Sequence, residues 1–283
     1  MTAKTLAARG RAPKTRMGRI EFLNVLPIYH AMEAGYVPHG FDLVYAPPSA
    51  LNAMMEQGEL AVSSTSCVEY ARRPEKYWIL PDLSIASHGE VLSVLLVSRF
   101  PVEKLNGKTV LVSAASHTSV ALLKLLLSGY AGISVSYVTG NASERMKSDD
   151  APDAMLVIGD EALRLRDHSE YKHMWDLGEE WMRWTGLPFV FGLWVASKSA
   201  SFTEDPAKTL HASRDWSLEN RGEFIRVAMD RYGMDREFLE RYFTCLKFTL
   251  GAKEQEGLSF FYKRLAESGE IARAPELSFW PGI

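Results

Sequence analysis

The sequence predicts an α/β protein built from two units, and three observations support this prediction. Apolar strand-like runs alternate with helix-like stretches up to about residue 197. A segment rich in turn signals interrupts this alternation near residue 100, and the chain after Lys198 has a helical pattern throughout. A chain of 283 residues also has room for about two domains.

In the first unit, proline and glycine mark where helices begin and end. Pro27 opens a helix that Gly35 closes, and Gly58 closes the helix that starts at Ser49. A capping-box pattern, Ser66 followed by Glu69, predicts the start of a third helix. The expected strands of this unit are 17–23, 41–45, 60–63, 78–80 and 91–97.

The second unit follows a predicted linker at residues 98–107, where the sequence SRFPVEKLNG contains a proline and an Asn-Gly turn. Its expected elements are strands at 109–113, 133–138 and 154–158, helices at 119–128 and 161–165, and a returning strand at 189–196. Further helices are expected at 206–216, 218–232, 236–244 and 252–267.

The composition excludes several classes of function. With 47% hydrophobic residues, 24% charged residues and a net charge of −3, the chain has no feature typical of a nucleic-acid or membrane-surface partner. No apolar stretch reaches 18 residues, so no membrane-spanning helix is expected. Cys67 and Cys245 lie far apart without CxxC spacing, and we expect a reduced, cytoplasmic chain.

The first 16 residues are basic and polar and lack the apolar segment of a secretory signal. We therefore expect residues 1–16 to form a disordered leader, with Met17 as an alternative translation start.

Common catalytic motifs are missing from this sequence. It contains no GxGxxG, GxxxxGK[ST], GxSxG or HExxH pattern, which disfavours nucleotide-binding, serine-hydrolase and zinc-peptidase functions. The seven histidines do not have the spacing of a metal site, so no metal is expected. His168 and His173 are expected in a solvated loop.

Small polar residues follow several predicted strands at the point where a helix begins. Ligands of open α/β sheets bind outside the carboxyl ends of the strands, and helix N-termini there attract anions. These junctions predict a cleft for a small anion with more than one carboxylate, although each of these residues is also a favoured helix cap. The residues are Asn24, Ser63, Ser64, Ser66, Ser116, His117, Thr118, Ser119, Gly159 and Asp160.

Two polar residues interrupt apolar runs. Asn24 lies within FLNVLP, where an unpaired buried amide would cost about 1–3 kcal/mol, so it is either satisfied locally or placed for a ligand. Ser93 interrupts the expected strand 91–97, where its hydroxyl has either a structural or a functional partner. In the aromatic stretch 181–194, Thr185, Gly186 and Phe189 are candidates for the wall of an apolar pocket.

Taken together, these segments resemble the MqnA family, the chorismate dehydratases of the futalosine pathway of menaquinone biosynthesis. The resemblance covers residues 18 to about 197 almost without gaps, and RYFTCLKFTLG (241–251) extends it less specifically. The matching pieces are GRIEFLNVLP (18–27), SCVEY (66–70), ILPDLSIASHGEVLSVLLVS (79–98), LNGKTVLVSAASHTSVALLKLLL (105–127), LVIGDEALR (156–164) and DLGEEWMRWTGLPFVFGLW (176–194).

The resemblance implies a periplasmic-binding-protein-like fold of type II, with a cleft between two α/β lobes. One lobe would comprise residues 17–97 and 196–283, and the inserted lobe residues 98–195. It also implies loss of water from chorismate to give 3-[(1-carboxyvinyl)oxy]benzoate, without a metal or an organic cofactor.

The same resemblance implies functional roles for Asn24 and Ser93. The junctions at Ser66 and at Ser116–Ser119 would hold carboxylates of the substrate. The serine-rich segment 61–66 departs from the family pattern, which leaves open which of Ser63, Ser64 and Ser66 faces the ligand.

The motifs contain no obvious strong base apart from His117, so we expect the side-chain carboxylate of chorismate to take the proton itself. Asn24 and Ser93 would orient the substrate and stabilise the departing hydroxide. The alternatives are His117 as the base, as in 1,4-dihydroxy-6-naphthoate synthase of the same pathway, and a non-catalytic solute-binding protein. The expected partner is the small-molecule substrate, and the chain is expected to be a monomer or a homodimer.

Overall fold

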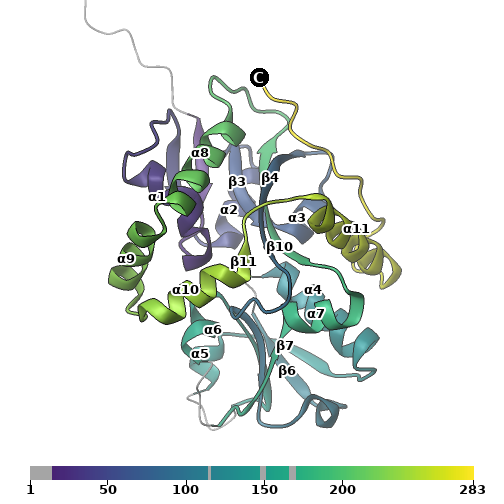
Figure 1. The fold of residues 1–283 in the computed structure, drawn as a ribbon. Helices are drawn as coiled ribbons and strands as arrows, with labels where there is room; N and C mark the ends of the chain where they lie inside the picture. Colours follow the sequence, from purple (N-terminus) through teal and green to yellow (C-terminus); the bar gives the residue numbers. More distant parts are fainter. Residues whose placement is uncertain (1–14, 114–115, 147–150, 166–169) are drawn as a thin grey trace, which may run out of the picture.

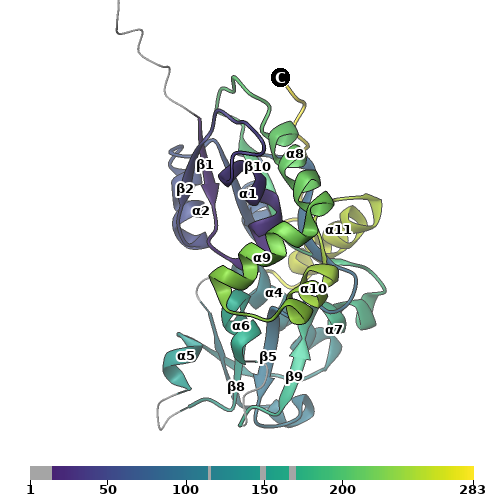
Figure 2. The ribbon, with the colours of Figure 1, turned by 60° about the vertical axis from the view of Figure 1, so that its left-hand side comes forward.

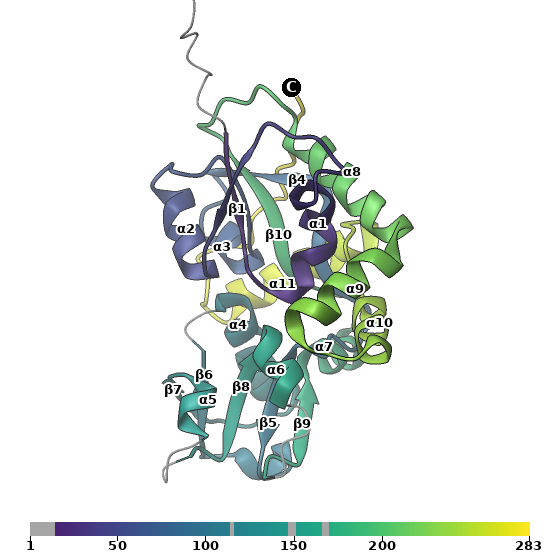
Figure 3. The ribbon, with the colours of Figure 1, turned by 90° about the vertical axis from the view of Figure 1, so that its left-hand side faces the viewer.

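The computed structural model describes residues 15–113, 116–146, 151–165 and 170–283, which form two α/β lobes (Figure 1). Each lobe is built around its own sheet, with six strands in one and five in the other. The two lobes are stacked one above the other in Figure 3, which views the molecule at 90° to Figure 1. The predicted α/β class is therefore confirmed.

The six-stranded sheet has the order β11-β4-β10-β3-β1-β2. Helices cover both of its faces, with α1, α8 and α9 on one side and α2, α3 and α11 on the other (Figure 3). Its strands are β1 (Arg16–Arg19), β2 (Asp42–Tyr45), β3 (Val62–Ser66), β4 (Tyr77–Ser87), β10 (Phe189–Ser197) and β11 (Leu246–Lys247). Its helices are α1 (Leu26–Glu33), α2 (Pro48–Glu56), α3 (Cys67–Arg72), α8 (Pro206–Glu219), α9 (Arg221–Tyr232) and α11 (Ala252–Glu267).

The five-stranded sheet has the order β7-β6-β8-β5-β9, with helices on both faces. Alternate residues of its central strands supply two separate apolar clusters: Ala154 and Leu156 belong to the main core, whereas Met155 and Val157 belong to a smaller one. Its strands are β5 (Val94–Ser98), β6 (Thr109–Val112), β7 (Ser136–Thr139), β8 (Ala154–Ile158) and β9 (His173–Asp176). Its helices are α4 (His117–Leu125), α5 (Ala142–Arg145), α6 (Gly159–Leu165) and α7 (Leu177–Thr185), with 3₁₀ segment η2 (Val102–Leu105) and π segment η3 (Leu126–Tyr130).

The chain crosses between the lobes at residues 88–93 and again at 186–188. The expected lobe boundaries at 97/98 and 195/196 need correction, because β5 pairs with β8 and β9 in the five-stranded sheet while β10 pairs with β3 and β4 in the six-stranded one. The predicted linker 98–107 instead connects two strands within one lobe. An apolar run shows that a strand is buried, but it does not show which sheet the strand joins.

Strand direction explains why the lobes meet at a cleft. The entering strands β5 and β10 run antiparallel to both of their neighbours, whereas β1, β2 and β3 are parallel, as are β6, β7 and β8. The carboxyl ends of the parallel strands therefore point toward the other lobe, where ligands of open α/β sheets bind. Helix α10 (Arg236–Cys245) lies at the level where the lobes meet (Figures 1 and 2).

Local signals account for several element boundaries. The Ser66 hydroxyl caps α3 by accepting a hydrogen bond from the Glu69 N–H, as the capping-box pattern predicted. The run 91–97 does not form one strand, because Leu92 has φ of 61° and β5 begins at Val94. The first strand ends at Arg19, and the chain then turns through the 3₁₀ segment η1 (Leu23–Val25) into α1.

Other predictions have mixed outcomes. Helix α7 and the short elements α5, β9 and β11 were not expected, and His173 lies on β9 with an exposed side chain rather than in a loop. Most of the predicted leader, residues 1–14, and His168 lie outside the described residues, while Arg16 belongs to β1. In the described parts of the chain, no helix combines the length and apolar character needed to cross a membrane.

Candidate active site

A cavity lies between the two lobes, at the carboxyl ends of β1, β3 and β8. Its empty space is about 730 Å³, open solvent included. The lining residues are Ile20, Phe22, Asn24, Val25, Pro48, Ser64, Thr65, Ser66, Ile85, Val91, Ser93, Val94, Ser116, Ser119, Ile158, Gly159, Phe191, Gly192 and Trp194.

The chemistry of this lining is polar but uncharged. None of the described lining residues has an ionisable side chain; their polar side chains are hydroxyls, one amide and one indole. The rest of the wall is aliphatic and aromatic. Such a cavity offers hydrogen bonds to an anion and an apolar surface to a ring, but no lining side chain that can act as a general acid or base.

Asn24 lies on η1, directly after the turn that follows β1. Its Oδ1 is buried and has no hydrogen-bond partner in the structure. The turn is held from the opposite lobe, where Asp160 Oδ1 accepts a hydrogen bond from the Leu23 N–H at 3.1 Å and the Phe22 ring lies over Gly159. The Asn24 amide oxygen therefore does not cap the following helix, because no backbone N–H donates a hydrogen bond to it.

The serine-rich end of β3 is divided between two roles. Ser64 and Ser66 line the cavity, and the Ser64 hydroxyl is buried without a hydrogen bond. Ser63 does not line it; its hydroxyl donates to the Ser64 carbonyl oxygen at 2.9 Å. Thr65 also lines the cavity, although it was not among the residues predicted from sequence. Its hydroxyl donates to Asn52 Oδ1 at 2.8 Å.

The opposite wall includes the start of α4. The Ser116 hydroxyl accepts a hydrogen bond from the Ser119 N–H at 3.2 Å and donates to the Ser119 hydroxyl at 2.8 Å. Gly159 completes this wall with φ of 57°, and its N–H donates to the Ser93 carbonyl oxygen at 2.7 Å. A left-handed conformation of this kind favours glycine.

Ser93 lies on the crossover 88–93, with its side chain 2% exposed. Its hydroxyl donates to the Val91 carbonyl oxygen at 3.3 Å and accepts a hydrogen bond from the Tyr242 hydroxyl at 3.2 Å. Burial holds the pKa of Tyr242 far above its usual value, so the phenol stays neutral. In contrast to Asn24, this hydroxyl is already bonded within the protein.

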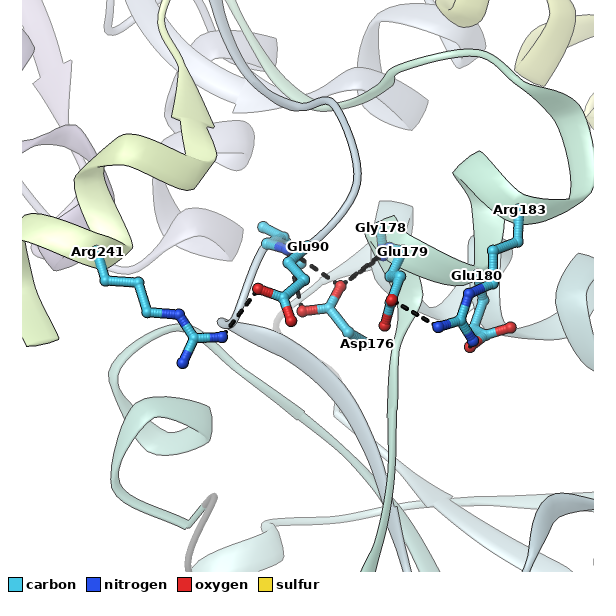
Figure 4. A network of polar contacts seen from close by, with 8 residues as sticks. Glu90, Asp176, Gly178, Glu179, Glu180, Arg183 and Arg241 are labelled. Atoms are coloured by element: carbon cyan, nitrogen blue, oxygen red, sulfur yellow. Dashed lines mark hydrogen bonds and ion pairs between the residues drawn. The ribbon is translucent and has the colours of Figure 1, made fainter.

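The crossover is fixed by a buried carboxylate. Asp176 accepts hydrogen bonds from the N–H groups of Val91 and Leu92 and from those of Gly178 and Glu179 at the start of α7 (Figure 4). Burial raises the pKa of this carboxyl although four N–H donors act to lower it. The unusual φ of Leu92 is therefore held by the hydrogen bonds that its own N–H and the Val91 N–H donate to Asp176.

Two predicted residues of the α4 junction lie outside this cavity. His117 has an exposed side chain, and desolvation followed by the charge of Arg72 lowers its pKa. Thr118 is buried, and its hydroxyl accepts a hydrogen bond from the Val68 N–H at 3.3 Å and contacts Cys67 Sγ. Thr118 thus joins α4 to α3 rather than contacting the cavity.

Asp160, Thr185 and Phe189 also lie outside the lining. Burial raises the pKa of Asp160, whose bond to Leu23 connects the lobes. The Thr185 hydroxyl donates to the Trp181 carbonyl oxygen at the end of α7, which is a structural contact. Phe189 packs against Trp181 in the core, while Phe191 lines the cavity.

Seven predicted residues therefore meet at one cavity: Asn24, Ser64, Ser66, Ser93, Ser116, Ser119 and Gly159. The missed residues are mostly apolar, including Phe22, Phe191 and Trp194. Phe22 is the first residue of the FLNVLP motif and Phe191 lies within the aromatic stretch, but nothing in the sequence separates such wall residues from core residues.

Comparison with known proteins adds independent information. A family model described as menaquinone biosynthesis matches residues 15–267. A chorismate dehydratase of Thermus thermophilus is 29% identical over 88% of this chain and 94% of its own length. One of Campylobacter jejuni is 32% identical over 62% and 64%, and a 1,4-dihydroxy-6-naphtoate synthase of Streptomyces coelicolor is 28% identical over 61% and 62%.

Solved structures show the fold. A protein of Archaeoglobus fulgidus matches with a TM-score of 0.75 and 22% identity, covering 90% of this chain and 98% of its own. The periplasmic aliphatic sulphonate-binding protein of Escherichia coli matches with a TM-score of 0.64 and 14% identity, covering 96% and 94%. The predicted periplasmic-binding-protein-like fold is thus confirmed.

Proposed function

The chain belongs to the menaquinone biosynthesis family, and from this premise we propose that it is a chorismate dehydratase. In this proposal it is a carbon–oxygen lyase that converts chorismate to 3-[(1-carboxyvinyl)oxy]benzoate and water. Two relatives with that name support the proposal, one of them aligned along nearly its whole length. A cytoplasmic location belongs to the same proposal.

One observation of the site carries the proposal furthest: the cavity is lined by neutral hydrogen-bonding groups and has no ionisable lining side chain among the described residues. Such a site suits a substrate that brings its own base. Chorismate has two carboxylates, and hydrogen bonds to charged groups contribute about 1.5–3 kcal/mol each. The hydroxyls of Ser64, Ser66, Ser116 and Ser119 are the proposed donors for these carboxylates.

The proposed reaction needs only the substrate's own groups for proton transfer. The side-chain carboxylate of chorismate removes the proton from C3 while the C4 hydroxyl leaves. The departing hydroxide takes up that proton as water, and the ring becomes aromatic, which makes the reaction favourable. The protein's contribution is to hold the substrate in the conformer where the carboxylate reaches C3.

Asn24 and Ser93 have the proposed catalytic roles because they line the same cavity from different segments. The Asn24 amide has a free buried oxygen that can accept a hydrogen bond from the substrate and an Nδ2 group that can donate one, and the Ser93 hydroxyl is held in place by Tyr242. We propose that these two groups orient the substrate and stabilise the departing hydroxide by hydrogen bonding. The apolar walls formed by Phe22, Phe191 and Trp194 would contact the ring.

The sister synthase of the same pathway is the second candidate, and the position of His117 disfavours it. A histidine base has to reach the substrate within about 2.6–3.2 Å or through one water. His117 is exposed and lies outside the described cavity lining. A non-catalytic solute-binding protein has the same fold, so the fold does not distinguish it from an enzyme.

Incubation of the purified protein with chorismate tests the proposal. We expect the benzoate product to appear without added metal or cofactor, in proportion to enzyme concentration. Binding of chorismate without product would favour the solute-binding alternative. Turnover of a cyclic futalosine derivative in place of chorismate would favour the synthase.

A further inference from the structure

Helix α10, in the C-terminal part of the chain, reaches the crossover between the lobes. Tyr242 lies on its buried face, 1% exposed, with its ring close to those of Phe238 and Phe243. Its hydroxyl donates to Ser93 Oγ at 3.2 Å. A residue 149 positions away in sequence thus determines how a cavity-lining hydroxyl is bonded.

Both hydrogen bonds of Ser93 Oγ are longer than usual, at 3.3 Å to the Val91 carbonyl oxygen and 3.2 Å from the Tyr242 hydroxyl. O–H···O hydrogen bonds usually span about 2.5–3.0 Å, so the 3.3 Å contact from Ser93 Oγ to the Val91 carbonyl oxygen is long and easily exchanged. The hydroxyl of a serine has one proton to donate and two lone pairs to accept with. The tyrosine hydroxyl occupies one lone pair of Ser93 Oγ. The Ser93 proton can therefore turn from the distant Val91 carbonyl oxygen to a ligand in the cavity.

We propose that Tyr242 is a positioning residue, which holds Ser93 Oγ as a hydrogen-bond donor to the leaving hydroxyl group of the substrate. This inference rests on the proposed dehydratase function. The chain of bonds runs from the tyrosine hydroxyl to the serine hydroxyl and then to the leaving oxygen. Each donor in such a chain strengthens the next, because accepting a hydrogen bond makes a hydroxyl a better donor.

The surroundings of Tyr242 support a donor role over mere packing. A phenylalanine would pack against the same rings, so packing alone gives no reason for a buried hydroxyl at this position. Burial also keeps the phenol protonated, which leaves it able to donate at any pH where the protein works. The neighbouring Arg241 forms an ion pair with Glu90 at 2.9 Å (Figure 4). Helix α10 therefore contacts the crossover through two successive residues, Arg241 and Tyr242.

A double-mutant cycle between Tyr242→Phe and Ser93→Ala tests the proposal. Removal of the phenol hydroxyl alone is expected to lower kcat about tenfold, with KM changed less than about twofold, which is the effect of one hydrogen bond made in the transition state. In the Ser93→Ala background, Tyr242→Phe is expected to have no further effect on kcat. Equal losses in both backgrounds, or an unchanged kcat for Tyr242→Phe, would overturn the positioning role.

Thermal unfolding of the same four proteins provides a readout that does not depend on turnover. Ser93→Ala leaves the buried Tyr242 hydroxyl without its partner, so its Tm is expected to fall, and the double variant is expected to recover part of that loss. A Tm for Ser93→Ala equal to that of the wild type would contradict the hydrogen bond itself. The Tm of Ser93→Ala therefore tests the hydrogen bond between Tyr242 and Ser93 even if Tyr242→Phe alone folds poorly.

Tyr171→Phe is the matched control, because Tyr171 is 2% exposed, close to the 1% of Tyr242, and its hydroxyl donates to the Pro152 carbonyl oxygen in the five-stranded lobe. It is expected to change Tm without changing kcat. If the wild-type protein yields no product from chorismate, the proposed function fails. If the wild type turns over and Tyr242→Phe matches it, only the positioning role fails.

Discussion

Two segments bring the proposed catalytic residues to one cavity, and they are built in opposite ways. The turn that carries Asn24 joins a strand to the next helix, α1, and leaves the amide oxygen unbonded. The crossover that carries Ser93 connects two lobes, and its hydroxyl is bonded on both sides. Both segments are held by a distant carboxylate, Asp160 for the turn and Asp176 for the crossover, but only the Ser93 side chain is itself bonded by a distant residue, Tyr242.

This difference has consequences for mutation. A side chain without hydrogen-bond partners can be removed without leaving a buried group unsatisfied, so its effect falls mainly on function. A bonded side chain leaves its partner unsatisfied when it is removed, so both stability and function change. Mutations in the two segments, and in the residues that hold them, test this contrast.

Asn24→Ala is expected to lower kcat with chorismate by about 10²–10³-fold, the range seen when one stabilising donor of a transition state is removed. Because its Oδ1 has no hydrogen bond in the structure, Tm should stay within about 2 °C of the wild type. Steady-state kinetics and thermal unfolding measure the two quantities. Normal turnover would remove Asn24 from the mechanism.

Ser93→Ala is expected to lower kcat by about 10²-fold and also to lower Tm, because the Tyr242 hydroxyl loses its acceptor. The same two measurements apply. The contrast with Asn24→Ala would be lost if both variants changed Tm equally. An unaffected kcat would leave Ser93 with a structural role.

Ser64→Ala and Ser63→Ala form a matched pair of neighbouring buried hydroxyls. Ser64→Ala should raise KM about tenfold, because it removes a proposed donor to a substrate carboxylate. Ser63→Ala should leave KM unchanged and lower Tm, since Ser63 bonds within the strand and does not line the cavity. Equal effects on KM would contradict the division of roles along β3.

Asp160→Ala is expected to lower kcat/KM by about fivefold, because the Leu23 N–H loses the acceptor that holds the Asn24 turn. Asp160→Asn should retain most activity, since an amide oxygen accepts the same bond. A similar loss of kcat/KM in both variants would instead indicate that the negative charge of Asp160 is needed, for example because the carboxylate contacts the substrate.

His117→Ala is expected to change kcat less than about twofold, because the exposed ring lies outside the cavity lining. With a pKa lowered below its usual 6.5, His117 acting as the base would make kcat fall as the pH drops through that lower value. We expect the wild type and His117→Ala to have the same dependence of kcat on pH below 6.5. If kcat of the wild type fell toward low pH and this fall were absent in His117→Ala, His117 would be the base.

Many elements of the fold could be predicted because their signals are local. Pro27 and Gly35 bracket α1, Ser66 caps α3, and the run 154–158 forms β8 within its predicted bounds. Helix α11 likewise matches its predicted range, 252–267. Helix α7 was missed because its aromatic residues resembled a core segment rather than a helix face, although Asp176 caps it.

In the candidate site, too, some features could be predicted from sequence and others could not. The polar residues at strand ends were visible from sequence, because the carboxyl ends of parallel strands meet at one edge of a sheet. Sequence did not show that Thr118 and Asp160 use their polar groups on protein neighbours. It also did not separate Ser64, which faces the cavity, from Ser63, which does not.

Local sequence was enough to predict the α/β class, the approximate bounds of most helices and the set of polar junction residues, because caps, turns and hydrophobic periodicity depend on neighbours a few residues away. Tertiary structure alone decided which sheet β5 and β10 joined, which junction residues faced the cavity, and that Tyr242 bonded to Ser93. Those outcomes depend on pairing between segments far apart in the chain. Such pairing follows from packing and hydrogen bonding across the whole molecule, and no local pattern encodes it.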